Sequence, residues 1–260
     1  MKLITFDPLI DSADIGCEHW NQLIDLIIGH DVAGVVVTHG TDTMAFTGAP
    51  LSFALDGIGI PVVLTGSMKP LGEGLQAEDN LRLAIDAATT GPVGVWLAFD
   101  GKLLCGRRLV KHHSQEPDSF RQVADAPPSS RTVVWRRFLP ERLSILTLSP
   151  GMHASTVEAA LSQLDGAVLR VFGSGTLMQE PALQRALLNA TDRGCRIIAV
   201  SCCEAGGVHQ GAYASDGLLW SSGVESGGTA TAEAALMRLW LELSERDRKQ
   251  HPETKLVAAI

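Results

Sequence analysis

The stretch Gly34-Val35-Val36-Val37-Thr38-His39-Gly40-Thr41-Asp42-Thr43 decides the fold. Its first half is apolar and β-branched, which predicts a buried strand. The mostly apolar residues from Met44 to Leu55 predict a helix after a tight turn. In an open parallel sheet, ligands bind at the carboxyl ends of the strands. A hydroxyl, a carboxylate and the N–H groups of a helix start would meet there.

A simpler interpretation of the same turn is a helix cap. Thr41 or Asp42 could accept a hydrogen bond from one of the unpaired N–H groups at the start of the following helix. Residues of these types cap helices often, so the turn alone does not separate a cap from a site.

Composition describes a folded protein without a basic surface. The chain has 260 residues, of which 45% are hydrophobic and 19% are charged. That length allows one large or two modest domains. Lys and Arg total 21 against 29 Asp and Glu, a net charge of −8. We therefore expect neither nucleic acid nor an anionic membrane as the main partner. The first residues are too short an apolar stretch for a signal peptide, and no apolar run is long enough to span a membrane.

The cysteines indicate a reducing compartment. Their number, five, is odd, and none shows Cys-x-x-Cys spacing. Reduced thiols in a cytoplasmic protein fit this pattern best. Cys202 and Cys203 end an apolar stretch, where a cysteine is usually an inert core residue. No His-Glu-x-x-His motif occurs, and we expect no metal and no cofactor.

Strands and helices alternate along the whole chain, which predicts an α/β fold with parallel sheets in two domains. We expect an N-terminal domain over residues 1–126, a linker over 127–142 and a smaller C-terminal domain over 143–260. The expected strands are 1–6, 34–38, 60–65, 93–99, 102–110 (antiparallel), 143–148, 167–172 and 196–202. The expected helices are 16–28, 44–55 (with a kink or a late start near Pro50), 77–88, 157–163, 181–193 and 230–243.

Several blocks, taken in order, resemble one family. They are His39-Gly-Thr-Asp-Thr43, Thr65-Gly-Ser-Met68, Lys111 after Arg107-Arg-Leu-Val110, Asp11-Ser-Ala-Asp14 and Arg170-Val-Phe-Gly-Ser-Gly175. Together they are similar to the bacterial L-asparaginases, most of all to the cytoplasmic type I branch. The resemblance runs from about Asp7 to about Leu243 and implies the two-domain fold of that family.

The resemblance also implies an activity and a set of site residues. The activity is hydrolysis of asparagine to aspartate and ammonia, without a cofactor, by a homodimer or homotetramer. Thr41, Asp42 and Lys111 would form a catalytic triad. Ser12 would hold the substrate α-carboxylate, Asp42 would bind the α-amino group, and the main chain near Gly40 and Ser67 would contact the substrate. Alternatively, Ser12 is a plain helix cap, and Lys111 is an ordinary ion-pair partner of Asp42 or a solvated lysine in a basic patch.

This chemistry is sensible on its own terms. A threonine hydroxyl, or a water, that attacks an amide needs a base and stabilisation of the developing oxyanion. A lysine can be that base only as a neutral amine, which burial favours and a neighbouring carboxylate opposes.

The chain also departs from the family pattern. The family begins with a strand ending in Thr-Gly-Gly-Thr-Ile, whose first Thr is the principal nucleophile, and no Thr-Gly-Gly-Thr occurs here. The chain could be a fragment, a short enzyme that uses Thr41, or a non-catalytic relative that binds a small amino acid or a partner chain. We expect weak activity or none from the chain as written.

Overall fold

The computed structural model describes residues 1–123, 135–211 and 217–250, with the side chain of residue 250 left out. The chain divides into two compact units, Met1–Trp135 and Arg136–Ile260. Both are α/β, as predicted. The narrower prediction, domains over 1–126 and 143–260 with a linker over 127–142, stays a prediction. Residues 127–134 of that linker lie outside the described residues.

The first unit is built on a sheet with the strand order β1-β2-β3-β4. Its strands are β1 (Val35–Thr38), β2 (Pro61–Thr65), β3 (Gly94–Phe99) and β4 (Lys102–Cys105). The first three are parallel, and β4 runs antiparallel to β3. All five residues of β2 are buried, because β2 is an inner strand with a helix on each face. The carboxyl ends of β1 and β2 therefore lie side by side, and their turns share one edge of the sheet.

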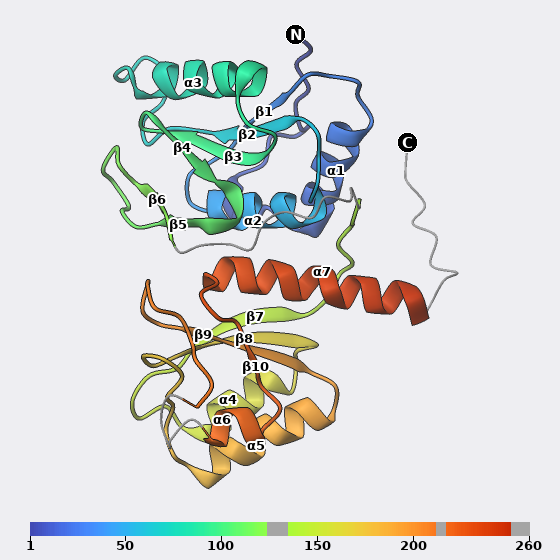
Figure 1. Cartoon of the computed structure of the whole chain (residues 1–260), viewed down its shortest axis with the longest axis vertical. Coiled ribbons are helices and arrows are strands. Elements are labelled where there is room, and N and C mark those ends of the chain that lie inside the picture. The colour runs from blue at the N-terminus through green and yellow to red at the C-terminus, as the bar shows by residue number, and fades with distance from the viewer. Residues whose placement is uncertain (124–134, 212–216, 251–260) are drawn as a thin grey trace. The chain divides into compact units, whose positions relative to one another are not determined.

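Two helices, α2 (Met44–Ala54) and α3 (Gln76–Thr90), pack against this sheet, and a third, α1 (Cys17–Ile28), packs against α2. A 3-10 turn, η1 (Ser12–Asp14), precedes them. Figure 1 shows α3 on one face of the sheet and α2 on the other. The helix α2 is buried on nearly all sides, which matches its lack of a polar face. The spacing of the apolar residues in α1 predicts one buried face made of Trp20, Leu23, Ile24, Ile27 and Ile28. The first four are buried, whereas Ile28, the last residue of the helix, is 40% exposed.

A close approach of two backbones fixes α2 against the segment that leads to Lys111. A Cβ added at Gly48 would lie 2.8 Å from the Gly106 carbonyl oxygen and 2.9 Å from Leu109 Cδ1. A Cβ added at Gly106 would lie 2.7 Å from Ser52 Oγ. Only glycine therefore fits at both positions of this contact. The contact joins α2 to the 3-10 turn η2 (Gly106–Arg108), directly before β5 (Leu109–Lys111).

An ion pair strengthens the same junction. Arg107 Nη2 donates to the Ser52 carbonyl and to Asp56 Oδ1, both at 2.9 Å. Its guanidinium lies 5.0 Å from the centroid of the Phe53 ring. Both members of the ion pair are largely buried. The strand β5 then pairs antiparallel with β6 (Phe120–Gln122) in a sheet of its own.

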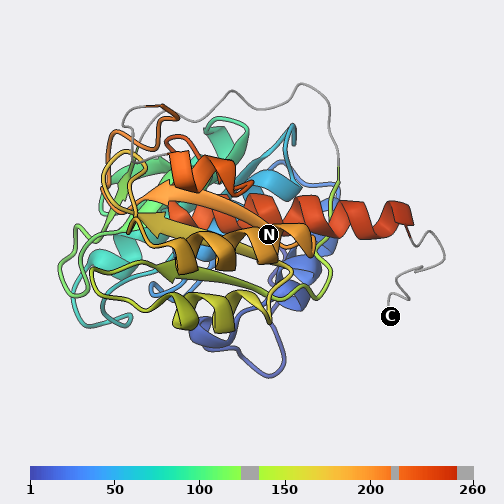
Figure 2. The ribbon, with the colours of Figure 1, turned by 90° about the horizontal axis from the view of Figure 1, so that it is seen from below.

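The second unit contains a sheet of four parallel strands in the order β10-β9-β8-β7. They are β7 (Leu143–Thr147), β8 (Gly166–Val171), β9 (Arg196–Ser201) and β10 (Glu225–Ser226). The helices of this unit are α4 (Ala154–Leu161), α5 (Pro181–Asp192), α6 (Gly217–Ser221) and α7 (Ala232–Gln250). The helix α7 covers one face of the sheet (Figure 1), and α4 and α5 lie side by side on the other (Figure 2). Leu169, Ile197 and Leu187 are among its fully buried residues.

The structure corrects several sequence-based expectations. Residues 1–6 form no strand, because they pair with no other strand of the described part of the chain. The helix α2 begins at Met44 and not near Pro50. Gly48 therefore lies inside the helix, where it packs against Gly106. The expected strand over 102–110 ends at Cys105, and Leu109 and Val110 belong to the sheet of β5 and β6.

Two further findings concern the surface. Cys202 and Cys203 are exposed, so the expectation of buried, inert cysteines is wrong, since both lie beyond the last residue of β9. Among the residues that the structure describes, no helix is both long and apolar enough to cross a membrane.

The glycine contact leads to a stability prediction. Ala at position 48 would gain about 1 kcal/mol of helix propensity over Gly. The methyl group would also press on the Gly106 backbone, and overpacking of this kind costs about 1–3 kcal/mol. We expect the steric cost to dominate, so that Gly48→Ala lowers the free energy of unfolding measured in urea. The matched control is Gly59→Ala, because a Cβ at Gly59 meets nothing within 4 Å. Equal or higher stability of Gly48→Ala would contradict the close approach.

Candidate functional site

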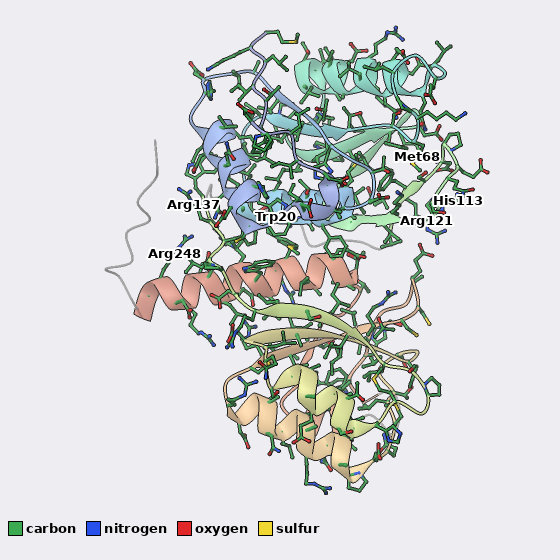
Figure 3. All side chains as sticks on the ribbon, turned by 180° about the vertical axis from the view of Figure 1, so that it is seen from behind. Trp20, Met68, His113, Arg121, Arg137 and Arg248 are labelled. Carbon is green, nitrogen blue, oxygen red and sulfur yellow. The ribbon has the colours of Figure 1, made fainter. Side chains whose placement is uncertain are left out.

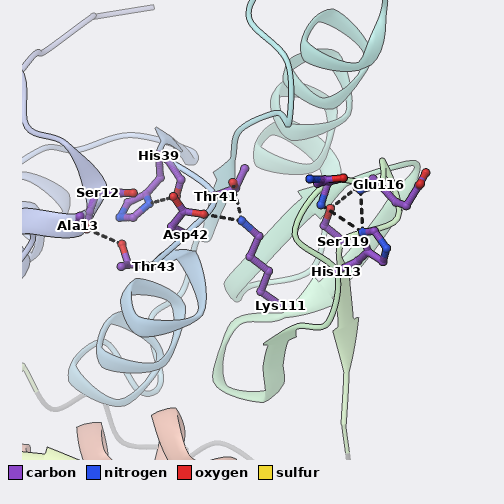
Figure 4. Close-up of polar contacts among 12 residues, drawn as sticks. Ser12, Ala13, His39, Thr41, Asp42, Thr43, Lys111, His113, Glu116 and Ser119 are labelled. Atoms are coloured by element: carbon purple, nitrogen blue, oxygen red, sulfur yellow. Dashed lines mark hydrogen bonds and ion pairs between the residues drawn. The ribbon is translucent and has the colours of Figure 1, made fainter.

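Lys111 reaches the turn that follows β1. Its Nζ donates to Thr41 Oγ1 at 3.0 Å and to Asp42 Oδ1 at 2.6 Å, as Figure 4 shows. The three residues suggested by the family resemblance as a triad are therefore in direct contact, although 69 residues separate Lys111 from Asp42. The arrangement places an amine within proton-transfer distance of a hydroxyl.

The two charged groups of this cluster differ in exposure. The Lys111 side chain is 16% exposed, whereas the Asp42 side chain is 79% exposed. The amine is thus held in the fold at the end of β5, and the carboxylate projects into solvent. An exposed carboxylate that binds Lys111 through one oxygen keeps its second oxygen accessible to an incoming ligand.

The helix-cap interpretation of this turn is not supported. The N-cap of α2 is Thr43, and it makes no side-chain cap hydrogen bond. Its hydroxyl donates instead to the Ser12 carbonyl at 2.5 Å. Thr41 and Asp42 are turned toward Lys111. The turn therefore uses its polar side chains for contacts outside the helix.

Ser12 is brought next to this turn. A Cβ added at Gly40 would lie 2.5 Å from Ser12 Oγ and 2.8 Å from Ser12 Cβ. Gly40 therefore allows the Ser12 turn to pack directly on the backbone before Thr41. The Asp11 side chain caps η1 by accepting from the Ala13 N–H at 2.9 Å. The cap of η1 is therefore Asp11 and not Ser12.

Ser67 lies in the neighbouring turn, after β2. Its hydroxyl donates to the Lys69 carbonyl and accepts from the Lys69 N–H. Both hydrogen bonds stay within the loop after β2. Gln76 holds the loop by accepting from the Met68 N–H at 3.0 Å and donating to the Pro117 carbonyl at 3.1 Å. Pro117 lies between β5 and β6, in the segment that also contains His113. Figure 3 shows Met68 and His113 at the same end of the first unit.

Two open cavities adjoin the turns. One, of about 360 Å³, is lined by Ser12, His39, Gly40 and neighbouring apolar residues. The other, of about 480 Å³, is lined by Ser67 and residues of α3. Thr38 and Gly66 line both, so the two cavities meet at the ends of β1 and β2. Thr41, Asp42 and Lys111 lie outside the linings of both.

Sequence reasoning missed a role for His39. Its Nδ1 lies 2.7 Å from the Gly40 carbonyl oxygen and its Nε2 lies 2.8 Å from Thr47 Oγ1. Burial lowers the pKa of the His39 imidazole below its ordinary value of 6.5, and the hydrogen bond to Gly40 opposes that shift. In the sequence, this role is indicated only by the position of His39 directly before Gly40. The contact with Thr47, eight residues further along, has no local signal.

No cluster of three or more His, Cys, Asp or Glu side chains within residues 1–123, 135–211 and 217–250 could hold a metal ion. The contacts described above bring together the Thr41 hydroxyl, the Lys111 amine and the Asp42 carboxylate. The fold and the site together define a class of protein. It has two α/β units built on mainly parallel sheets, and a lysine, a threonine and an aspartate meet at the strand ends of the first unit.

Comparison with known proteins gives the family within this class. Residues 4–136 match the model of the asparaginase N-terminal domain, and residues 142–254 match that of the glutaminase/asparaginase C-terminal domain. The chain therefore belongs to the asparaginase family.

Individual relatives agree with this assignment. The chain is 33% identical over 263 residues to L-asparaginase 1 of Escherichia coli, and the alignment covers 92% of this chain and 78% of that protein. It resembles the solved structure of L-asparaginase I from Vibrio cholerae with a TM-score of 0.83 and 28% identity, covering 97% and 84% of the two chains. It also resembles the thermostable L-asparaginase from Thermococcus kodakarensis, with a TM-score of 0.81, 29% identity and coverage of 93% and 80%.

The lowered pKa of His39 leads to a prediction about acid stability. Below pH 6.5 the unfolded chain protonates this imidazole, whereas the folded chain keeps it neutral until its lower pKa is reached. The unfolded state then binds more protons, so stability falls as the pH drops through this window. We expect His39→Gln to lose less unfolding free energy than the unmodified chain between pH 7.5 and 5.5. Equal losses in urea unfolding would contradict a half-buried His39 that stays neutral in the folded state.

Proposed function

We propose that this chain is an amidohydrolase that converts L-asparagine to L-aspartate and ammonia. The observation that carries the proposal is the contact of Lys111 Nζ with Thr41 Oγ1 and Asp42 Oδ1 at the end of a parallel sheet. Membership of the asparaginase family and the names of the similar proteins support the same reaction. The proposed catalytic residues are Thr41, Asp42 and Lys111.

The chemistry assigned to these residues is acyl transfer. In its neutral form, Lys111 takes the proton of the Thr41 hydroxyl, or of a water held by Thr41. The oxygen attacks the side-chain amide carbon, and the proton passes to the leaving nitrogen, which departs as ammonia. If Thr41 is the nucleophile, a water then hydrolyses the aspartyl ester and restores the hydroxyl. Asp42 orients the Lys111 amine through its 2.6 Å contact.

The exposed groups around the cluster would recognise the substrate. The exposed Asp42 carboxylate is suited to the positive α-amino group, and the Ser12 hydroxyl is suited to the α-carboxylate. Gly40 packs on Ser12, and the turn of Ser67 lies at the end of the adjacent strand. The backbone of these two turns would contact the rest of the substrate. The required partner is therefore a small amino acid, without a cofactor.

The pattern expected of the family is incomplete within these 260 residues, since no Thr-Gly-Gly-Thr occurs. We propose that turnover by these residues runs through Thr41. A cytoplasmic location is proposed from the five free cysteines, and a homodimer or homotetramer from the family resemblance.

The direct test replaces the Thr41 hydroxyl by a methyl group of similar volume. We expect Thr41→Val to lower ammonia release from L-asparagine by about a hundredfold or more. The matched control is Thr89→Val on the exposed face of α3, where the hydroxyl only donates to the Ile85 carbonyl. This variant keeps full turnover. Equal ammonia release by Thr41→Val and the unmodified chain would remove Thr41 from the mechanism.

Ligand binding separates an enzyme from a non-catalytic relative. A protein that only binds the amino acid would be stabilised by millimolar L-aspartate, since ligand binding to the folded state raises its melting temperature, and it would release no ammonia. The proposal requires both stabilisation and ammonia release. Stabilisation alone would favour the non-catalytic alternative.

A further inference from the structure

The imidazole of His39 connects the helices behind the site to the turn that carries Thr41. On one side, Nδ1 lies 2.7 Å from the Gly40 carbonyl oxygen. On the other, Nε2 lies 2.8 Å from Thr47 Oγ1 on α2, and the Trp20 indole N–H of α1 reaches the same oxygen at 3.2 Å. Figure 3 shows Trp20 between α1 and α2. Trp20 is 3% exposed and Thr47 is fully buried, so the chain of contacts starts in the core.

The direction of each hydrogen bond follows from what each group can do. The indole N–H only donates, and the Gly40 carbonyl only accepts. His39 Nδ1 therefore carries a proton, and Thr47 Oγ1 accepts from Trp20. The neutral imidazole then has a lone pair on Nε2, which accepts from the Thr47 hydroxyl. All four groups are satisfied by one tautomer, with the proton on Nδ1.

This tautomer fixes the peptide between Gly40 and Thr41. In a trans peptide the N–H points opposite to the carbonyl, so a carbonyl held toward His39 sets the direction of the Thr41 N–H as well. The N–H and carbonyl groups of His39 itself are also held in place. The His39 N–H donates to the Thr65 carbonyl at 2.9 Å, and a Cβ at Gly66 would lie 2.3 Å from the His39 carbonyl oxygen.

We infer that His39 is a positioning residue: by holding the Gly40 carbonyl, it presents the Thr41 hydroxyl to Lys111 in the geometry that the reaction needs. The inference rests on the proposed hydrolysis of asparagine. His39 itself reaches Lys111 and Asp42 only through the turn. Its loss should therefore lower the rate of the chemical step more than it weakens substrate binding.

Two conservative substitutions of His39 each keep the contact of one ring nitrogen and remove the contact of the other. The amide nitrogen of an asparagine occupies nearly the place of Nδ1, whereas the end of a glutamine side chain occupies nearly the place of Nε2. His39→Asn keeps the bond to Gly40, and His39→Gln keeps the contact with Thr47. We expect His39→Asn to retain kcat within about threefold, and His39→Gln to lower kcat about tenfold with KM changed by less than about threefold.

A second pair of variants covers the case in which His39→Gln does not fold. Thr47→Val removes the hydroxyl that Nε2 accepts from, and Thr47→Ser keeps it. Without this hydroxyl the imidazole proton is no longer held on Nδ1, whereas the amide nitrogen of His39→Asn always carries N–H donors. We therefore expect a lower kcat in Thr47→Val and recovery in Thr47→Ser. A purely structural role would lower the melting temperature of His39→Asn and His39→Gln alike and would leave the kcat of the folded fraction unchanged.

Ammonia release and ¹⁵N NMR of the imidazole decide the outcome. The inference predicts a protonated Nδ1 and an unprotonated Nε2 in the unmodified chain, together with the split in kcat between the asparagine and glutamine variants. The opposite tautomer, or equal kcat in His39→Gln and the unmodified chain, would overturn the positioning role and leave the proposed hydrolysis intact. An unmodified chain that releases no ammonia would overturn the proposed function, and the positioning inference with it.

Discussion

The close approach of Gly48 and Gly106 is the constraint on which the site depends. It lets η2 pack against α2 with no side chain between the two backbones, and β5 follows at once. Lys111 ends β5, so the contact sets how far its amine is from the turn at the start of the same helix. Arg107 adds an ion pair to Asp56 at this junction. The contact between these two glycines thus helps to bring Lys111 next to Thr41, about seventy positions earlier in the chain.

A second constraint comes from the parallel pairing of β1 and β2. Because both strands end at one edge, the turn with Thr41 and the turn with Ser67 become neighbours. Asn80, which is 1% exposed, ties this edge further by donating to the Gly66 carbonyl and accepting from the Asp100 N–H, both at 2.8 Å. His39 lies at the same edge and joins it to the core through Thr47. The catalytic turn is therefore supported by fixed backbone and by buried polar contacts, as a precise site requires.

The sequence predicted most of this fold from hydrophobic patterning. The strands around Val36 and Val63 were predicted because their apolar residues are continuous. The expected burial is found for β2, whereas β1 is only half-buried because it is the edge strand of its sheet. Residues 1–6 are mostly apolar but find no partner strand, and Leu3 stays 83% exposed. A start of α2 near Pro50 was predicted from local propensity, which tertiary packing at Gly48 overrides. The contacts of Thr47 with His39 and Trp20 depend on residues apart in the chain and have no local signal. The contact of Lys111 with Thr41 was predicted only from the family resemblance.

The proposed hydrolysis of asparagine needs the amine of Lys111, which the fold places beside Thr41. The most direct measurement compares ammonia release by Lys111→Met with that by Lys102→Met. Lys102 forms an exposed ion pair with Asp118, which contributes little to stability, and it makes no described contact with Thr41 or Asp42. We expect Lys111→Met to lose turnover and Lys102→Met to keep it. Equal turnover in both variants would contradict this role of Lys111.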